Sequence, residues 1–418
     1  METGIQIVNW KTMIADSKKN VDQNETGQSL NGCEEREQGM TGRICFSVEE
    51  ARKVRAFHAG FSEYSVTPLV SLKALAEEWG VSGIYVKDES ARFGLNAFKA
   101  LGGSYAMGIY AGAEPGTLTF VTATDGNHGR GVAWAAARMG MNSVVYMPKG
   151  TARERLDRIR SLGAEASITE MNYDDTVRFA RKQAERNGWI LIQDTAWDGY
   201  TEVPMRIMQG YMTMADEAAE QLGEKRPTHV FLQAGVGSMA AAVAAYFVNR
   251  YGEKNRPVLT VVEPQQADCF FRTARADDGI LHAVAGDLTT IMAGLACGEI
   301  NPLAWNILRE CTDYFASIPD WVAAGGMRIL GNPLAQDQRI ISGESGAAPF
   351  GLAAWLLQGG RKAWRSADRQ EMSNFRRGWK ERLGLNRDSV LLFISTEGAT
   401  DLENYRRIVW EGAYPMPE

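Results

Sequence analysis

Cysteine is scarce in this chain of 418 residues. The five cysteines are Cys33, Cys45, Cys269, Cys297 and Cys311, and no two of them are spaced as Cys-x-x-Cys. An odd, widely spaced set argues against both a zinc knot and a disulfide framework. The cytoplasm is therefore the expected compartment. A single disulfide between Cys269 and Cys297, which both lie in loop-like sequence, stays open.

The chain also lacks a block of charge of one sign. Its 45 basic and 51 acidic side chains give a formal net charge of −6, which argues against a nucleic-acid or anionic-membrane partner and favours a small molecule. No basic start followed by an apolar run is present, so no secretory signal is predicted. The longest uncharged stretch, residues 230–249, contains Gln233, Gly235 and Gly237. It is predicted to be a strand, a turn and a buried helix, and no membrane span is expected.

The length of the chain predicts two lobes, because a single hydrophobic core stops growing below this size. Residues 1–48 are rich in polar side chains and are expected to form a loosely ordered extension. From Val66 onward, short apolar runs alternate with amphipathic helical stretches, as parallel strands joined by crossover helices do. The predicted fold is α/β, with two lobes of mostly parallel sheets flanked by helices.

The predicted strands fall into two series. One series occupies residues 105–195, which are expected to form a small α/β domain. Residues 49–104 and 196–418 are expected to form the large domain. Its strands read as continuous apolar runs, as parallel strands buried on both faces do, at 229–232, 258–262 and 390–394.

Ligands bind open parallel sheets beyond the carboxyl ends of the strands, where polar motifs are found in this sequence. In the first motif, Asn-Ala-Phe-Lys99, the lysine heads an apolar helix flanked by glycine. Burial and the helix dipole would depress the basicity of this amine and favour the neutral form that Schiff-base chemistry needs. The alternative is a solvated surface lysine.

Two further motifs lie between a predicted strand and a predicted helix. In Asp125-Gly-Asn127-His, Asn127 can cap the helix while Asp125 places a carboxylate in the same crevice. The motif Gly235-Val236-Gly237-Ser238 would let backbone N–H groups converge on a phosphate at a helix N-terminus. Each motif taken alone is equally compatible with a plain turn.

The last two motifs are Ser395-Thr396-Glu397-Gly398, after the final apolar strand, and Gly343-Glu344-Ser345-Gly346. Each could be only a polar turn. Together, the five motifs supply an amine, an amide, an anion-binding loop, a hydroxyl and a carboxylate. No metal-ligand cluster and no Ser-His-Asp set competes with them in the sequence, so no metal site is predicted.

These motifs resemble those of the fold-type II pyridoxal-phosphate enzymes, the group of the tryptophan synthase β-subunit and threonine dehydratase. Longer strings, among them KDESARFGLNAFKALGGSYAM, TDGNHGRGVAWAA and QDTAWDGYT, resemble the diaminopropionate ammonia-lyases of that group. The resemblance covers residues 46–410. It implies pyridoxal 5'-phosphate as the cofactor, bound by the large domain. It also implies a carbon–nitrogen lyase that converts D- and L-2,3-diaminopropionate to pyruvate and ammonia.

The resemblance implies a role for each motif. Lys99 would bind the cofactor covalently, Asn127 would contact its ring oxygen, and the loop 235–238 would hold its phosphate. Ser395 or Thr396 would pair with the pyridine nitrogen. A further residue, Glu344, would lie near the face of the cofactor in a role that the sequence does not define.

Two acids, Asp125 and Asp194, are carried over as catalytic residues. Related dehydratases have a small residue where Asp125 stands. A carboxylate on the face opposite Lys99 would let one site remove the Cα proton from either enantiomer, with Lys99 serving the L form and Asp125 the D form. For Asp194 the sequence leaves three possibilities: it binds the β-ammonium of the substrate, it relays a proton, or it caps a turn.

Two other functions stay open. One is a serine or threonine dehydratase of the same fold, against which Asp125 argues. The other is a non-catalytic homologue that binds an amino acid, against which the intact Lys99 argues. The resemblance also implies a homodimer whose only other partner is a small-molecule amino-acid substrate.

Overall fold

The computed structural model describes residues 4–14, 43–110, 112–124, 126–358 and 368–417. The strands are β1 (Gln6–Asn9), β2 (Leu69–Ser71), β3 (Gly83–Asp88), β4 (Thr119–Ala123), β5 (Asn142–Met147), β6 (Glu165–Ile168), β7 (Ile190–Leu191), β8 (His229–Gln233), β9 (Val258–Pro264), β10 (Tyr314–Ile318) and β11 (Val390–Ser395). The helices of the first half are α3 (Val48–Ala59), α4 (Lys73–Trp79), α5 (Ala100–Met107), α6 (Asn127–Arg138), α7 (Arg153–Arg160), α8 (Tyr173–Asn187), α9 (Glu202–Gly210) and α10 (Met212–Leu222). Those of the second half are α11 (Ser238–Tyr251), α12 (Cys269–Ala276), α13 (Pro302–Cys311), α14 (Asp320–Gly331), α15 (Glu344–Leu357), α16 (Asp368–Arg382) and α17 (Leu402–Val409). Short 3₁₀ turns are η1 (Glu89–Gly94), η2 (Gly108–Tyr110), η3 (Gln265–Ala267) and η4 (Ala293–Leu295).

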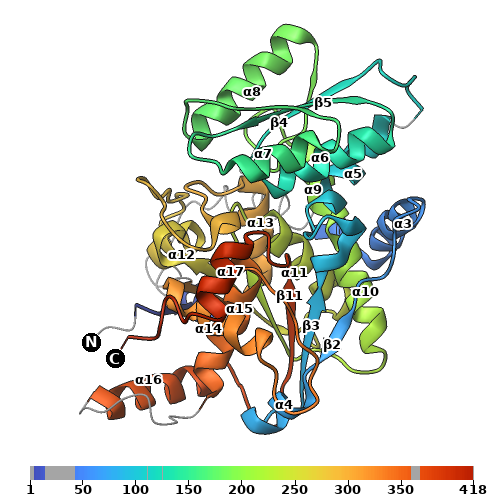
Figure 1. The fold of residues 1–418 in the computed structure, drawn as a ribbon. Coiled ribbons are helices and arrows are strands. Elements are labelled where there is room, and N and C mark those ends of the chain that lie inside the picture. The colour runs from blue at the N-terminus through green and yellow to red at the C-terminus, as the bar shows by residue number, and fades with distance from the viewer. Residues whose placement is uncertain (1–3, 15–42, 111, 125, 359–367, 418) are drawn as a thin grey trace, which may run out of the picture.

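Two sheets organise these elements (Figure 1). The larger sheet has seven strands in the order β1-β10-β9-β8-β11-β3-β2. Its two edge strands are antiparallel to their neighbours, and the strands between them are parallel. The smaller sheet has four parallel strands in the order β6-β5-β4-β7. The prediction of an α/β fold with mostly parallel sheets flanked by helices is confirmed.

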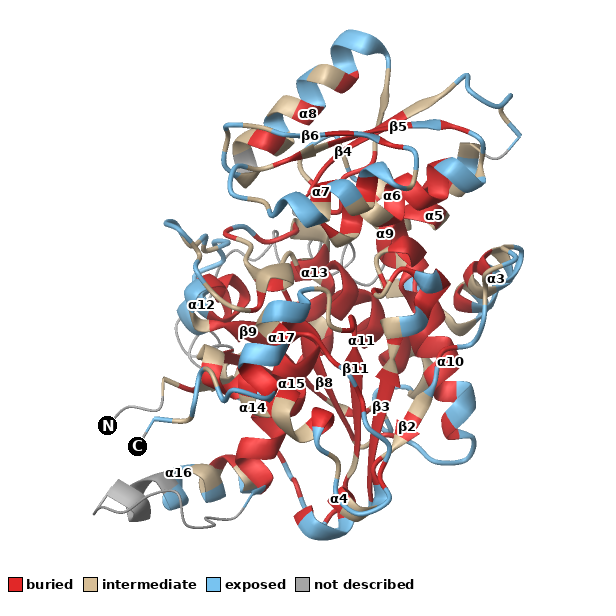
Figure 2. Ribbon diagram, viewed as in Figure 1, coloured by how far each residue is buried: buried red, intermediate tan, exposed pale blue. Residues whose placement is uncertain are grey.

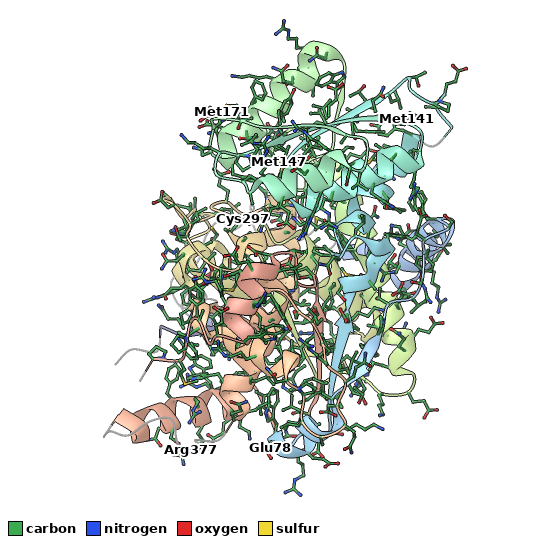
Figure 3. The ribbon with its side chains drawn as sticks, viewed as in Figure 1. Glu78, Met141, Met147, Met171, Cys297 and Arg377 are labelled. Carbon is green, nitrogen blue, oxygen red and sulfur yellow. The ribbon has the colours of Figure 1, made fainter. Side chains whose placement is uncertain are left out.

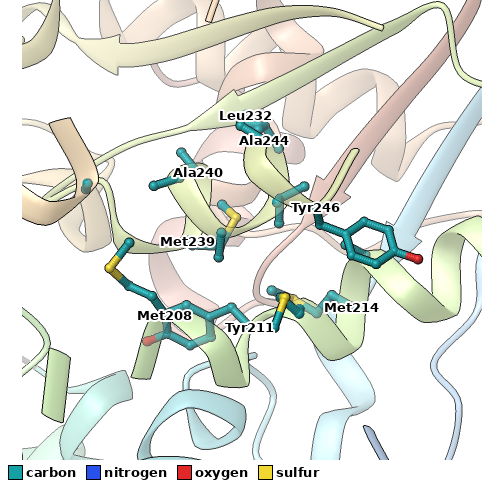
Figure 4. Packing of buried hydrophobic residues seen from close by; sticks show 14 of the residues in the cluster. Met208, Tyr211, Met214, Leu232, Met239, Ala240, Ala244 and Tyr246 are labelled. Atoms are coloured by element: carbon teal, nitrogen blue, oxygen red, sulfur yellow. The ribbon is translucent and has the colours of Figure 1, made fainter. Parts of the chain in front are cut away.

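The larger sheet is buried on both faces, which explains its continuous apolar strands. All residues of β8 are buried, and so are all residues of α15, which packs against the sheet. Figure 2 shows the central strands together with α11 and α15 as buried. In Figure 4 the side chains of α9, of α10 and of Tyr211 between them pack against α11 and β8: Met208, Tyr211 and Met214 on one side and Leu232, Met239, Ala240 and Ala244 on the other.

Helices cover both faces of the smaller sheet as well. In Figure 1, α8 lies over the outer face, whereas α6 and α7 lie between this sheet and the rest of the molecule. The series of strands predicted within residues 105–195 corresponds to β4 through β7, which are joined by helices as expected. The apolar runs predicted at 229–232, 258–262 and 390–394 correspond to β8, β9 and β11.

The N-terminal residues differ from the prediction of a loosely ordered extension over residues 1–48. Residues 6–9 form β1, which pairs antiparallel with β10, and the flanking Ile5 and Trp10 are 4% and 5% exposed. The indole of Trp10 donates to the backbone oxygen of Arg309 at 2.7 Å and packs against Trp305. The polar composition of the whole segment obscures this short apolar run, which completes the edge of the sheet. The part from 15 to 42 lies outside the described residues.

Among the described residues, no helix combines the length and apolar composition needed to cross a membrane.

Candidate active site

A cavity of about 460 Å³ lies at the carboxyl ends of strands from both sheets. Its lining includes Lys99 before α5, Asn127 at the start of α6, Asp194 after β7, residues 235–239 in the turn after β8 and the start of α11, and Thr396 after β11. Cys297, another lining residue, lies between the two sheets in Figure 3. The structure therefore brings together residues that are far apart in the sequence, at the edge where parallel sheets bind ligands.

The side chain of Lys99 enters this cavity from the N-terminal end of α5. Its Nζ lies 2.8 Å from Oδ2 of Asp194, and the side chain is 22% exposed. Helix α5 packs closely against α6 because Gly131 has no side chain: a Cβ there would lie 2.8 Å from Cα of Ala100. This close contact holds the start of α5, and with it Lys99, next to the cavity.

Asp194 is a buried carboxylate that stays ionised. Burial alone would favour its neutral form, but the charges of Lys99 and His128 and the hydrogen bond from Lys99 lower the pKa of Asp194 to about 2. While Lys99 carries its charge, this carboxylate is suited to hold a cation in the cavity.

Asn127 donates from Nδ2 to Oε2 of Glu397 at 2.6 Å. Glu397 is 6% exposed and lines the cavity. Sequence reasoning named the motif around Glu397 but gave this side chain no role. Its only signal was its place two residues beyond a buried strand. Asp125 lies outside the described residues, so its predicted place opposite Lys99 stays a prediction.

The loop 235–238 has the geometry of an anion-binding turn. Gly237 has a φ of +91°, and a Cβ there would lie 2.2 Å from Cζ of Phe270, so both the backbone and the packing require glycine. Helix α11 starts at the next residue, and the first N–H groups of a helix have no intrahelical partner. Such N–H groups bind phosphate.

The hydroxyl of Ser238 serves the protein itself. It donates to the backbone oxygen of Asp194 at 2.9 Å and accepts from Nδ2 of Asn301 at 2.9 Å. An anion at this turn would therefore be held by backbone N–H groups rather than by this hydroxyl. The bond to Asp194 also ties the loop to the carboxylate that pairs with Lys99.

Ser395 and Thr396, which the sequence does not distinguish, have different surroundings. Oγ of Ser395 donates to Oγ of Ser342 at 2.8 Å, and Ser395 is not part of the cavity lining. Thr396 is 4% exposed and lines the cavity. Of these two hydroxyls, Thr396 is the one placed to contact a ligand.

Glu344 lies in an adjoining cavity of about 370 Å³, which shares Lys99, Asn127 and Glu397 with the first cavity. Burial and the charge of Glu397 raise the pKa of Glu344 to about 7, although a hydrogen bond from Nδ2 of Asn404 at 2.5 Å opposes this rise. The charge of Glu344 is therefore expected to change near neutral pH.

Pyridoxal phosphate fits the cavity. Oγ of Ser345 and Oε1 of Gln233 are buried in its lining without a hydrogen-bond partner. Unpaired buried polar atoms call for a polar ligand or a water molecule. The amine of Lys99 suits the aldehyde of the cofactor, and the turn at Gly237 suits its phosphate.

Neither a metal site nor a disulfide is found in the part of the chain that the structure describes. No group of three or more His, Cys, Asp or Glu side chains there could hold a metal ion. No disulfide joins Cys269 and Cys297; instead, Sγ of Cys269 donates to the backbone oxygen of Cys297 at 3.4 Å.

Comparison with known proteins gives consistent matches. A model of the family described as pyridoxal-phosphate dependent enzyme matches residues 61–364. The diaminopropionate ammonia-lyase of Escherichia coli (strain K12) is 50% identical over 390 residues, which are 89% of this chain and 94% of that protein. Two crystal structures of the E. coli enzyme, one in complex with an aminoacrylate-PLP azomethine reaction intermediate and one with D-serine, each have a TM-score of 0.82 and 45% identity. Each covers 99% of this chain and 98% of its own.

Proposed function

Because the chain belongs to the diaminopropionate ammonia-lyases, within the pyridoxal-phosphate-dependent enzymes, we propose that it eliminates ammonia from both D- and L-2,3-diaminopropionate. The resemblance seen in the sequence is confirmed, and the chain is a pyridoxal-phosphate-dependent lyase. The products are pyruvate and two molecules of ammonia, with one water consumed. The observation that carries the proposal is the pair of Lys99 and Asp194, 2.8 Å apart in a cavity that also contains an anion-binding turn.

The cofactor, when bound, supplies an aldehyde for the amino group of the substrate and a ring that draws electrons from Cα. The chain supplies the groups that hold and orient it. Lys99 would hold the aldehyde carbon, and the backbone N–H groups at the start of α11 would hold the phosphate. Asn127 would contact the ring oxygen with its amide, and Thr396 would contact the ring nitrogen with its hydroxyl.

Lys99 and Asp125 move protons at Cα. The amine of Lys99 takes the proton from the L enantiomer, and the carboxylate of Asp125 takes it from the D enantiomer on the opposite face. Asp194 keeps a negative charge at neutral pH and holds a cation, which is the ammonium of Lys99 in this structure. A proton acceptor must be neutral, so when the amine of Lys99 is free and uncharged the β-ammonium of the substrate would take the place of that cation. Glu344 would lie near the bound cofactor, since it lines the adjoining cavity that shares Lys99 with the first one.

The test compares substrates. Purified protein loaded with pyridoxal phosphate is given D- and L-2,3-diaminopropionate and, separately, D- and L-serine, and pyruvate is measured with a coupled assay. We expect faster elimination from both diaminopropionate enantiomers than from either serine. Equal or faster turnover of L-serine alone would establish the dehydratase function instead. Cofactor binding without any release of ammonia would establish a non-catalytic amino-acid-binding protein.

The substitution Asp125→Asn tests the assignment of two bases. It should slow the reaction of the D isomer by about 100-fold or more, the usual contribution of a general base, and change the L reaction far less. Asp198→Asn is the matched control, because it makes the same change at an exposed position four residues after Asp194. It should change the rate of neither enantiomer. Equal losses for the two enantiomers in Asp125→Asn would rule out separate bases.

The domain boundaries, the assembly and the compartment also belong to this proposal. We assign residues 105–195 to a small domain, and residues 49–104 and 196–418 to a large cofactor-binding domain. This division is supported by the smaller sheet, whose four strands all lie within residues 119–191. The resemblance to the family supports a cytoplasmic homodimer. The described cysteines form no disulfide, as is usual in a reducing compartment.

A further inference from the structure

We propose that Gln233 is a positioning residue that turns the hydroxyl proton of Thr396 into the cavity, so that Thr396 donates to the ring nitrogen of the cofactor. This inference rests on the proposed function. It goes further because it assigns a direction to a single proton and names the side chain that sets it.

Gln233 and Thr396 meet at the carboxyl ends of adjacent parallel strands. Gln233 is the last residue of β8, Thr396 follows β11, and the two strands pair in register. Nε2 of Gln233 lies 2.9 Å from Oγ1 of Thr396 and 3.0 Å from the backbone oxygen of Ile394. The two side chains are 2% and 4% exposed, so bulk water does not compete for these bonds.

The orientation of the Gln233 amide follows from the contact with Ile394. A backbone carbonyl oxygen can only accept a hydrogen bond, so the atom that faces it must be the nitrogen of the amide. The amide NH₂ group has two hydrogens and accepts nothing. One hydrogen goes to the oxygen of Ile394 and the other to Oγ1 of Thr396.

The hydroxyl of Thr396 is therefore an acceptor toward Gln233, and its own proton must point elsewhere. Thr396 lines the cavity, and no described residue accepts a hydrogen bond from this hydroxyl. The cavity is the direction that remains. Ser395 contrasts with it, because the proton of Ser395 is directed to Oγ of Ser342, away from the cavity lining.

The other end of the Gln233 amide supports this assignment. Oε1 of Gln233 is buried without a partner. Rotating the amide by half a turn would place this oxygen against the carbonyl of Ile394, where two acceptors repel. The amide keeps both hydrogen bonds of Nε2, although its oxygen is left unpaired. The two acceptors, Ile394 and Thr396, therefore fix the orientation of the amide.

A hydroxyl whose proton points at the ring nitrogen favours the unprotonated form of that nitrogen, because a protonated nitrogen would direct its own hydrogen at another hydrogen. An unprotonated ring withdraws electrons less strongly than a protonated one. This property suits rapid loss of a β-substituent rather than prolonged storage of charge on the ring. Gln233 would thus influence the type of reaction without touching the substrate.

The test uses holoenzyme prepared with pyridoxal phosphate that is labelled with ¹⁵N in the ring, and follows protonation of the ring nitrogen by NMR as the pH is varied. In Gln233→Glu an oxygen replaces Nε2. That oxygen carries at most one proton, and it donates this proton to the carbonyl of Ile394. Thr396 must then donate its own hydroxyl proton to the oxygen of residue 233, away from the cavity. We expect the protonation midpoint of the ring nitrogen to rise by about one pH unit or more, as loss of a hydrogen bond to the neutral form does.

Two further variants keep the result interpretable. Gln233→Met has a similar length and no polar atoms, so Thr396 can turn either way and the midpoint should be intermediate. Thr396→Ser keeps the hydroxyl and should keep the parent midpoint. Because Gln233→Met adds no buried charge, it tests the inference even where Gln233→Glu does not fold.

A parent midpoint in both Gln233 variants, with circular dichroism showing a folded chain, would overturn the inference. So would a midpoint in Thr396→Ser that matches Gln233→Glu. Failure of the parent chain to bind the labelled cofactor at Lys99, seen as no borohydride-fixed label on that residue, is a different result. It would overturn the proposed function itself.

Discussion

Two lysines at opposite ends of the string KDESARFGLNAFK make the same contact in opposite surroundings. Lys87 lies 2.6 Å from Oε2 of Glu217 and Lys99 lies 2.8 Å from Oδ2 of Asp194. The first pair is 0% exposed on both sides, whereas the side chain of Lys99 is 22% exposed toward the cavity. Salt-bridge length alone therefore does not separate a structural lysine from a reactive one.

The surroundings of Lys87 explain its structural role. Its Nζ also donates to the backbone oxygen of Thr67 at 2.7 Å and to Oε1 of Gln221 at 2.9 Å, so all three of its hydrogens are used. Arg92 pairs with the same carboxylate, that of Glu217, and with Glu89. Arg92 and Lys87 together lower the pKa of Glu217 below its ordinary value, against the opposing effect of burial. The network balances two positive against two negative charges and leaves no room for a ligand.

The comparison is tested most strongly at Lys99. Lys99→Ala should lower turnover by about 1,000-fold or more, since the amine is both the covalent anchor and a proton acceptor. The unfolding free energy should change by no more than about 1 to 2 kcal/mol, because the carboxylate left behind borders an open cavity. Turnover and urea denaturation measure the two effects. Lys99→Arg is the matched control: it keeps the ion pair with Asp194 and should still be inactive. Parent turnover in either variant would contradict the assignment.

The next largest effect is expected at Lys87. Lys87→Met removes one partner of a sealed charge network and should cost about 3 to 5 kcal/mol of unfolding free energy. Turnover per folded molecule should stay at the parent value, because Lys87 lines neither cavity of the active site. Urea denaturation followed by circular dichroism measures the loss. Lys73→Met, at an exposed position, should cost almost nothing. A loss of turnover without a loss of stability in Lys87→Met would show that the two lysines are not functionally distinct.

The smallest effect concerns Glu344, a buried carboxyl group that forms no salt bridge within the part of the chain that the structure describes. Its pKa is about 7 in the folded chain, above the ordinary value of 4.5, so the folded state holds a proton that the unfolded state loses first. Stability should therefore fall as the pH rises from 4.5 to about 7, by about 1 to 3 kcal/mol, and no further above that range.

Glu344→Gln removes this titration. Relative to the parent chain, the variant should gain unfolding free energy between pH 5 and pH 8 in urea denaturation experiments. Glu403→Gln, at an exposed position on α17, is the control and should track the parent chain at both pH values. If the unfolding free energy of Glu344→Gln also follows that of the parent chain at both pH values, Glu344 is already ionised at neutral pH.

The sequence predicts the elements whose signal is local. Strands β8, β9 and β11 are continuous apolar runs, and they were found because central parallel strands are buried on both faces. Strand β1 was missed because four residues in a polar segment carry little signal of their own; β10, which they cover, supplies their hydrogen-bond partners. Strand pairing across hundreds of residues has no local pattern.

The same limit applies to the site. Lys99 and Gly237 were found because they sit in motifs of the family at strand ends. Glu397 and Gln233 were not given roles, because these depend on contacts with Asn127 and Thr396, which lie far away in the sequence. The choice between Ser395 and Thr396 likewise required their surroundings, since neighbouring residues of a strand face opposite sides.

Strand β1 has a practical consequence for anyone who shortens or extends the chain. Its residues occupy the outer edge of β10, where the backbone N–H and C=O groups of Tyr314–Ile318 would otherwise be open to another molecule. Exposed strand edges recruit further strands and seed aggregates. Trimming the first ten or so residues to aid crystallisation would uncover such an edge, so fusion tags are better attached ahead of residue 1 through a linker.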